Sequence, residues 1–328
     1  MTSIAEPSQS ASAHGIVVDG LVKEFKEGVR AVDGIHFHVE PGEIYGFLGP
    51  NGAGKSTTVL MLTTLLPPTA GTGTVAGHDI VRDPAGVRSV MGVALQEVAL
   101  DPMLTGLEHL QLQASLQGLP KARTARRCVE LLERVGLTDA ASRKTATYSG
   151  GMKRRLDLAL ALVHSPSILF LDEPTTGIDP ANRVGLWDEV AKLAREDGVT
   201  VLLTTQYLEE ADQLAQRIGI IDGGRIVAEG TPASLKAEIG RPRIEVRPEA
   251  AADVARVETL LRQFGADVAA PPGKVGIRFA SAETALANVV RELDQAHIAI
   301  AELQVFSPTL DDVFMAKTGH SLEGDEGQ

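Results

Sequence analysis

The stretch Gly49-Pro50-Asn51-Gly52-Ala53-Gly54-Lys55-Ser56 decides the fold of this chain. Residues 44–48 before it predict a strand, and residues 57–66 after it predict a helix that Pro67-Pro68 ends. Glycines let the backbone N–H groups of such a loop turn inward toward phosphate oxygens, and the helix N-terminus adds the positive end of its dipole. The spacing G-x-x-x-x-G-K-[ST] between a strand and a helix therefore predicts a phosphate-binding loop. The alternative is a strand-to-helix turn that carries these letters by chance.

Two side chains of this loop have predicted roles. Lys55 is expected to neutralise the β- and γ-phosphates of a nucleotide, and the hydroxyl of Ser56 is expected to hold Mg²⁺. Thr57, the next residue, belongs to the same predicted nucleotide site.

Two carboxylates follow a second predicted strand. Residues 168–171 are wholly apolar and run directly into Asp172 and Glu173, which would lie at the nucleotide edge of a parallel sheet. Asp172 is placed to orient Mg²⁺ through water, and Glu173 can accept a proton from the water that attacks the γ-phosphate. Alone, the pair could be a solvated acidic turn before Pro174. Together with the loop, it indicates a nucleoside triphosphatase.

Composition excludes several other classes of protein. The chain has 328 residues, with 31 Lys and Arg against 43 Asp and Glu and a formal net charge of −12, which argues against a nucleic-acid partner. Its one cysteine, Cys128, excludes an internal disulfide and a cysteine-based zinc site. No apolar run reaches the roughly 18 residues of a spanning helix, and residues 1–12 lack a signal-peptide core. We therefore expect a protein that is neither secreted nor inserted into a membrane by itself.

The remaining patterns predict an α/β fold in its first part. Residues 1–15 form a polar tail, and residues 104–135 have helical periodicity that breaks near Gly118, as in a helical insertion. The apolar runs 168–171 and 201–203 predict buried parallel strands, and Gly223-Gly224 predicts a hairpin turn.

A linker is predicted at Gly240-Arg241-Pro242. Beyond it, the strand and helix patterns of residues 243–306 have the order βαββαβ, including a helix over 282–295, which predicts a ferredoxin-like α+β domain. The accessory domain is therefore expected over residues 241–318, followed by an acidic tail over 319–328.

A third motif indicates which kind of nucleoside triphosphatase the chain resembles. The run Tyr148-Ser149-Gly150-Gly151-Met152-Lys153-Arg154-Arg155 resembles the signature sequence of ATP-binding cassette (ABC) proteins, and the resemblance covers residues 16–231. It implies a P-loop cassette over residues 16–240, with a mixed central sheet, an antiparallel N-terminal β subdomain and a helical subdomain at about 97–148. The basic residues Lys153-Arg154-Arg155 are interpreted as helix surface or as a contact with a partner.

The resemblance also implies further site residues. Phe25 stands where the family stacks an aromatic ring on adenine, Gln96 where it has a glutamine that meets Mg²⁺ and the attacking water, and Asp179 in its interface loop. Ser149, Gly150 and Gly151 would bind the γ-phosphate of the nucleotide held by the other subunit, so a complete site requires a head-to-tail homodimer.

Two positions depart from the family pattern. Met152 stands where many members have glutamine, and Gln206 where most have a histidine that touches the γ-phosphate. Glutamine can hydrogen-bond a phosphate oxygen but cannot carry a proton or a positive charge, so more of the catalytic base role falls on Glu173. The run around Gln206, and Leu310-Asp311-Asp312-Val313-Phe314 near the C-terminus, resemble the daunorubicin-resistance branch of ATP-binding subunits.

This resemblance implies an ATPase subunit of a drug, antibiotic or lipid exporter. It would use ATP and Mg²⁺, form a homodimer, and associate on the cytoplasmic face of the cell membrane with a separate integral-membrane permease. The alternatives are an ABC ATPase that acts on ribosomes or DNA, and the ATPase subunit of an importer. A two-cassette chain or a long coiled-coil insertion, common in the ribosome and DNA class, does not fit in 328 residues.

Overall fold

The computed structural model describes residues 15–279, 285–320 and 322. Most of the predicted tails 1–15 and 319–328, and the start of the helix predicted over 282–295, therefore lie outside the described residues. The chain divides into two compact units, Met1–Pro232 and Ala233–Gln328. Within the described residues, no helix combines the length and the apolar composition that crossing a bilayer requires.

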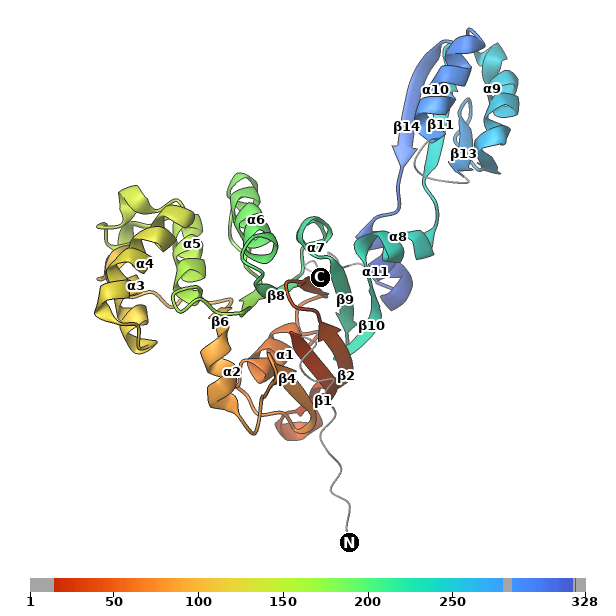
Figure 1. Cartoon of the computed structure of the whole chain (residues 1–328). Helices are drawn as coiled ribbons and strands as arrows, with labels where there is room; N and C mark the ends of the chain where they lie inside the picture. Colours follow the sequence, from red (N-terminus) through yellow and green to blue (C-terminus); the bar gives the residue numbers. More distant parts are fainter. Residues whose placement is uncertain (1–14, 280–284, 321, 323–328) are drawn as a thin grey trace. The chain divides into compact units, whose positions relative to one another are not determined.

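A four-stranded antiparallel sheet carries the N-terminal part of the first unit. Its order is β2-β1-β4-β5, which confirms the predicted β subdomain (Figure 1). The buried residues of β1 and β2 are separated by half-buried or exposed ones, as expected for a sheet with one buried face. The strands are β1 (Ile16–Glu24), β2 (Arg30–Val39), β4 (Ala70–Val75) and β5 (His78–Asp79).

A six-stranded mixed sheet forms the centre of the first unit. Its order is β10-β9-β3-β8-β7-β6, in which only the edge strand β10 is antiparallel to its neighbour. Every residue of β3, β7 and β8 is buried, which explains why these strands have apolar centres and carry few charged residues. The strands are β3 (Ile44–Leu48), β6 (Met91–Ala94), β7 (Ile168–Asp172), β8 (Thr200–Thr205), β9 (Arg217–Asp222) and β10 (Arg225–Gly230).

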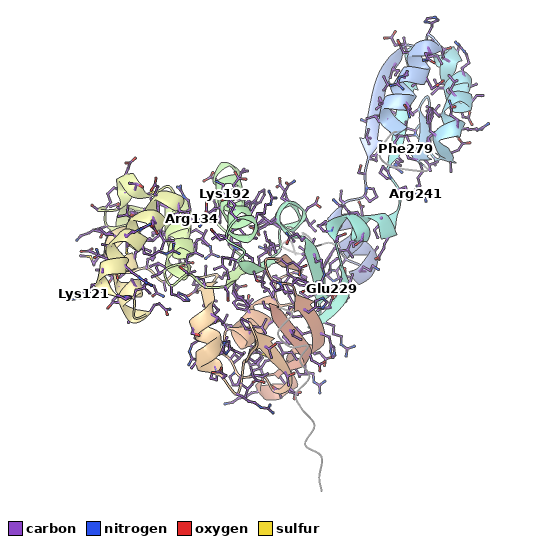
Figure 2. All side chains as sticks on the ribbon, in the orientation of Figure 1. Lys121, Arg134, Lys192, Glu229, Arg241 and Phe279 are labelled. Atoms are coloured by element: carbon purple, nitrogen blue, oxygen red, sulfur yellow. The ribbon has the colours of Figure 1, made fainter. Side chains whose placement is uncertain are left out.

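The helical insertion contains α3 (Gly106–Leu116) and α4 (Lys121–Arg134), and it leads into α5 (Gly150–Ala161) (Figure 1). A capping box between Thr105 and Glu108 begins α3, and Gly118, with a φ of +71°, lies in the break between α3 and α4. Lys121 and Arg134 mark the two ends of α4 in Figure 2. The remaining helices of the unit are α1 (Lys55–Leu62), α2 (Pro84–Val90), α6 (Pro180–Arg195) and α7 (Leu208–Leu214).

Helix α1 is shorter than the sequence predicts, because it ends at Leu62 rather than at residue 66. Thr64 has a φ of +62°, and the N–H groups of Leu65 and Leu66 both donate to the carbonyl of Leu60. This left-handed turn ends the helix before Pro67 is reached.

The second unit contains the sheet order β12-β13-β11-β14 with every neighbouring pair antiparallel, as the ferredoxin-like plan predicts. Helices α9 and α10 pack on one face of this sheet (Figure 1), where Val257, Leu261, Val289 and Leu293 meet the apolar side chains of the strands. The elements are β11 (Arg243–Pro248), α9 (Val254–Leu261), β12 (Gly265–Val268), β13 (Val275–Phe279), α10 (Ala285–Gln295) and β14 (Ile300–Phe306).

Two further helices belong to the second unit, α8 (Pro232–Ile239) and α11 (Leu310–Thr318). The Lys317 ammonium pairs with the Glu238 carboxylate at 2.7 Å, so α11 contacts α8. The division between the units therefore falls at the start of α8, ahead of the linker predicted at Gly240.

Candidate nucleotide-binding site

The loop Gly49–Ser56 connects β3 to α1 and turns tightly against neighbouring backbone. A Cβ atom at Gly49 would lie 2.2 Å from the carbonyl oxygen of Ile221, and one at Gly54 would lie 2.3 Å from that of Ala31. Gly54 also has a φ of +107°, which L side chains rarely adopt. The two glycines are required by close packing, and the strand–loop–helix context predicted for them is confirmed.

Lys55 is buried at the centre of the site. Its ammonium donates to the carbonyl oxygens of Gly49 at 2.7 Å and of Pro50 at 3.0 Å, and lies 3.5 Å from the Glu173 carboxylate. Desolvation lowers the pKa of Lys55 below its ordinary value, and the neighbouring Glu173 charge opposes that effect. The loop therefore holds a cation beside the backbone where phosphates would bind.

Ser56 and Asp172, which are both predicted to serve Mg²⁺, lie in contact with each other. The Ser56 hydroxyl donates to Asp172 Oδ1 at 3.1 Å, and the Thr204 hydroxyl donates to the same oxygen. Hydroxyl and carboxylate oxygens suit Mg²⁺, which is commonly held by one or two carboxylates together with substrate phosphates. The side chains present therefore fit the ion.

Glu173 lies beyond the end of β7 in a strained conformation. Its φ is +49°, a left-handed value that costs a non-glycine residue roughly 1–2 kcal/mol. Its backbone N–H contacts both the carbonyl and the hydroxyl oxygen of Thr204 at 3.1 Å. Its carboxylate accepts hydrogen bonds from Gln96 and from Thr176, each at 3.2 Å. The structure thus brings together Glu173 and Gln96, which are 77 residues apart in the chain.

These groups surround a cleft of about 330 Å³. Its walls combine a glycine-rich backbone, a lysine, two hydroxyl groups, two amides and a carboxylate, which together can contact phosphates and an attacking water. The lining residues are Asn51, Gly52, Gly54, Lys55, Ser56, Thr57, Gln96 and Glu173.

Other predicted site residues do not line this cleft in the described part of the chain. Phe25 is 44% exposed, with the Lys23 ammonium 5.4 Å from its ring centroid. Gln206 is half-buried directly after β8, and Asp179 is exposed before α6.

The predicted signature turn lies at the N-terminus of α5. Ser149 is the N-cap, and its hydroxyl oxygen accepts a hydrogen bond from the Met152 N–H at 3.2 Å. Gly150 and Gly151 form the first helical turn. None of the three lines the phosphate cleft of its own chain within the described residues.

The interpretation of Arg154 as a surface or partner-facing residue is wrong. Arg154 is 5% exposed, and its guanidinium donates to the carbonyl oxygens of Asp172, Glu173, Pro174 and Leu95. Desolvation lowers its pKa from the ordinary value, although an arginine stays protonated in proteins. The sequence carries one signal of this burial, which is helical phase. Arg154 lies four and seven positions before the buried Leu158 and Ala161, and therefore on the same face of α5.

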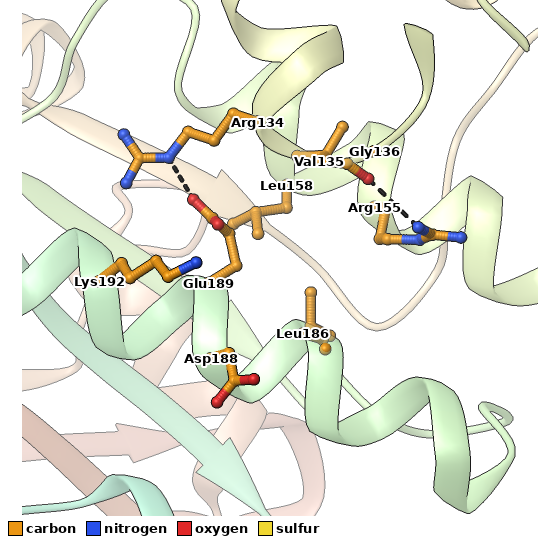
Figure 3. Close-up of a pocket in the computed structure, with 10 residues that line it drawn as sticks. Arg134, Val135, Gly136, Arg155, Leu158, Leu186, Asp188, Glu189 and Lys192 are labelled. Atoms are coloured by element: carbon orange, nitrogen blue, oxygen red, sulfur yellow. Dashed lines mark hydrogen bonds and ion pairs between the residues drawn. The ribbon is translucent and has the colours of Figure 1, made fainter. Parts of the chain in front are cut away.

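A second cleft of about 330 Å³ lies between α4, α5 and α6 and contains no residue of the phosphate loop. Arg134 pairs with Glu189 across it, and Arg155 donates to the carbonyl of Val135 at 3.3 Å (Figure 3). These contacts join the helical insertion to α5 and α6, so we interpret this cleft as structural.

Comparison with known proteins agrees with this geometry. Residues 32–176 match the family described as ABC transporter, and residues 230–318 match the family described as ATP-binding protein DrrA1-3-like, C-terminal domain. The daunorubicin/doxorubicin resistance ATP-binding protein DrrA of Streptomyces peucetius is 46% identical, over 94% of this chain and 93% of that protein. The chain belongs to the DrrA-like ABC ATP-binding proteins.

Further relatives and solved structures are similar to this ABC ATP-binding protein. The doxorubicin resistance ATP-binding protein DrrA of Mycobacterium tuberculosis is 44% identical, over 94% of this chain and 95% of that protein. The linearmycin resistance ATP-binding protein LnrL of Bacillus subtilis is 39% identical, over 89% and 94% respectively. An ATP-binding subunit of an ABC transporter has a TM-score of 0.62 at 29% identity, covering 68% of this chain and 92% of that one.

The dimeric structure of a bacterial ABC transporter cassette has a TM-score of 0.61 at 26% identity, covering 66% of this chain and 98% of that one. The fold class and the family predicted from the motifs are therefore confirmed. The DrrA-like protein is an ATPase.

Proposed function

We propose that this ATPase powers the export of a drug, antibiotic or lipid-like compound through a separate integral-membrane permease. The observation that carries the proposal is the identity to drug-resistance ATP-binding proteins, which extends over 94% of the chain and includes the C-terminal unit. The subunit would then work on the cytoplasmic face of the cell membrane, held there by its permease.

In the proposed reaction, water attacks the γ-phosphorus of ATP and the bond to the oxygen of ADP breaks. The Glu173 carboxylate accepts the proton of that water, and Gln96, which donates to the same carboxylate at 3.2 Å, orients the water. Lys55 and the loop N–H groups bind the phosphate oxygens. Ser56, Gln96 and Asp172 would hold Mg²⁺, which neutralises charge on the phosphates when bound. Gln206 would contribute a neutral hydrogen bond to the γ-phosphate, and Phe25 a flat ring for the adenine.

We further propose that two copies assemble head to tail around two nucleotides. The Ser149 oxygen accepts the Met152 N–H, so the Ser149 hydroxyl proton can be donated to a phosphate. Gly150 and Gly151 add backbone N–H groups at the positive end of α5. With Asp179 in the interface, this turn would complete the site of the partner subunit. The dimeric structure of a related cassette supports the arrangement.

Replacing Glu173 by glutamine tests the base assignment. We expect Glu173→Gln to bind ATP with an affinity near that of wild type and to lose about 10²- to 10⁴-fold in turnover, because the amide cannot accept the proton. Size-exclusion chromatography with light scattering should then show a dimer that persists in Mg·ATP. Glu196→Gln, an exposed substitution after α6, is the matched control. Near-normal turnover in Glu173→Gln would remove Glu173 from the base role.

The transport role is tested separately in cells. We expect a polytopic membrane protein to co-purify with the tagged chain, and cells that lack the chain to accumulate more of the exported compound. Co-purification with ribosomes or DNA, or reduced uptake of a nutrient, would favour the two alternative classes instead.

A further inference from the structure

One side chain, Arg154, joins three segments of the ATPase site. It lies in α5, five residues after the N-cap Ser149. Its Nη2 atom donates to the carbonyl oxygens of Asp172 at 2.7 Å and of Glu173 at 2.9 Å, and its Nε atom donates to that of Pro174 at 2.9 Å. Its Nη1 atom donates to the carbonyl of Leu95, the residue before Gln96.

Arginine suits this position because its planar guanidinium presents five N–H donors in a fixed fork. Each of its three nitrogen atoms has at least one partner, and the residue is 5% exposed. A lysine in the same place would offer a single nitrogen. Four carbonyl groups from two distant segments could not all be reached from one ammonium.

The turn that receives these hydrogen bonds needs support. At the end of β7, the carbonyls of three consecutive residues, 172 to 174, all accept hydrogen bonds from Arg154, and Glu173, the first residue beyond the strand, holds a φ of +49°. Strained backbone of this kind persists only where surrounding groups fix it. Arg154 contacts all three of these carbonyls, and the Thr204 contacts fix the opposite side of the Glu173 peptide.

The Leu95 contact extends this support to the other catalytic segment. Gln96 Nε2 donates to Glu173 Oε2 at 3.2 Å, and Arg154 fixes the backbone on both sides of that hydrogen bond. A shift of either backbone would change where the attacking water is held.

We propose that Arg154 is a positioning residue for ATP hydrolysis, which holds the Glu173 turn and the Gln96 segment in reactive geometry and joins them to α5. The inference rests on the proposed role of Glu173 as the base. Under this proposal, ATP is bound by the phosphate loop, with which Arg154 makes no contact.

Substituting Arg154 tests this division between binding and chemistry. In Arg154→Lys and Arg154→Met we expect the Kd for a fluorescent ATP analogue to stay within about threefold of wild type. Turnover should fall between about 10- and 100-fold, as for a small misplacement of reacting groups. Arg126→Met, which removes an 86% exposed arginine from α4, is the matched control and should leave both quantities unchanged.

A double-mutant cycle shows whether Arg154 acts through Glu173. In the Glu173→Gln background, the Arg154→Lys change should have no further effect on residual single-turnover hydrolysis, because residues that act as a unit are non-additive. Turnover within threefold of wild type in Arg154→Lys would overturn the proposal, as would additive effects in the cycle or a Kd that weakens in step with turnover. Loss of the folded state in both Arg154 variants would also overturn it, in favour of a purely structural role.

If instead Glu173→Gln alone retained normal turnover, the base assignment would fail while the cycle still measured Arg154 independently. The two failures are therefore distinguishable.

Discussion

At the scale of single residues, Gln206 is the clearest departure from what the family pattern implies. It is half-buried directly after β8, two residues beyond Thr204, whose hydroxyl donates to Asp172. An amide has no proton to transfer near neutral pH, so any pH dependence of hydrolysis in this range must come from other groups.

We predict that Gln206→His keeps turnover within about threefold of wild type at pH 8, since a neutral imidazole can also donate one hydrogen bond to a phosphate. Because an unperturbed histidine has a pKa near 6.5, the variant should also acquire a pH dependence between about pH 6 and pH 7 in addition to that of wild type. Steady-state turnover from pH 6 to pH 8.5 measures both effects. A collapse of turnover at every pH would show that the amide makes contacts that no imidazole reproduces.

Sequence alone could predict the residues whose chemistry depends on local spacing. Lys55 and Ser56 follow from a continuous motif, and Asp172 and Glu173 follow from an apolar strand that ends in carboxylates. The contacts of Thr204 and Arg154 could not be predicted in this way, although helical phase indicates that Arg154 is buried. Arg154 contacts carbonyl groups as far as 59 residues away in the sequence. Because every residue has a backbone carbonyl, a sequence pattern cannot show which of them accept a hydrogen bond.

At the scale of elements, α5 links the predicted signature turn to the segment of Asp172 and Glu173 and carries a second charged side chain, the half-buried Asp157. Asp157 Oδ2 lies 3.4 Å from Arg154 Nη1, and burial raises the pKa of Asp157 from its ordinary 3.8 to about 6, although the arginine opposes the shift. The folded chain therefore binds more protons at this carboxyl than the unfolded chain between these two pH values. The contribution of Asp157 to stability falls as pH rises from about 3.8 to about 6.

We predict that Asp157→Asn flattens this part of the stability curve. The variant and wild type should have similar free energies of unfolding below pH 4. Above pH 6 the variant should be more stable by up to about 3 kcal/mol, which is the full shift converted at 1.36 kcal/mol per pH unit. Urea titrations from pH 4 to pH 8, followed by the fluorescence of the single tryptophan Trp187 in α6, report on this unit. A variant less stable than wild type at pH 7 would show that the ion pair with Arg154 outweighs desolvation.

Element types followed the sequence patterns, but element ends often did not. The apolar runs predicted β3, β7 and β8 because burial on both faces leaves a direct pattern in the sequence. The early end of α1 depends on a left-handed Thr64, a conformation that threonine rarely adopts and that no local signal announces.

At the scale of the whole molecule, the structure of the second unit explains the residue pattern of the Leu310–Phe314 run. Thr309 and Asp312 form a capping box that begins α11, and Leu310, Val313 and Phe314 are buried. The run thus specifies a capped helix with one buried face. We propose that this unit serves assembly of the ATPase with its permease or with a second copy, since it carries no chemical motif of its own.

Deletion of residues 241–328 tests that proposal. We expect the remaining cassette to bind ATP, because every lining residue of the phosphate cleft lies before residue 174, and to lose most of its co-purification with the permease. Phe314→Ala in the full chain, which should destabilise α11 by about 3–5 kcal/mol, asks whether α11 alone accounts for the effect. Unchanged assembly in the deletion would discard the assembly role.

The order of strands in the second unit was predictable because each strand and helix is short and bounded by turn residues. The first and last residues of the unit were less predictable from the sequence. Its helices α8 and α11 contact each other through Glu238 and Lys317, which are 79 residues apart and which no sequence pattern connects.

The left-handed backbone of Glu173 has an evolutionary consequence. Selection for folding alone would favour glycine at this position, because glycine adopts a φ of +49° without strain. A random stabilising search should therefore find inactive proteins here before active ones, since the substitution that relaxes the turn removes the carboxylate. Under the proposed base role, glutamate at this site serves turnover at the expense of stability, so directed evolution that selects for both heat resistance and ATPase activity should hold position 173 fixed.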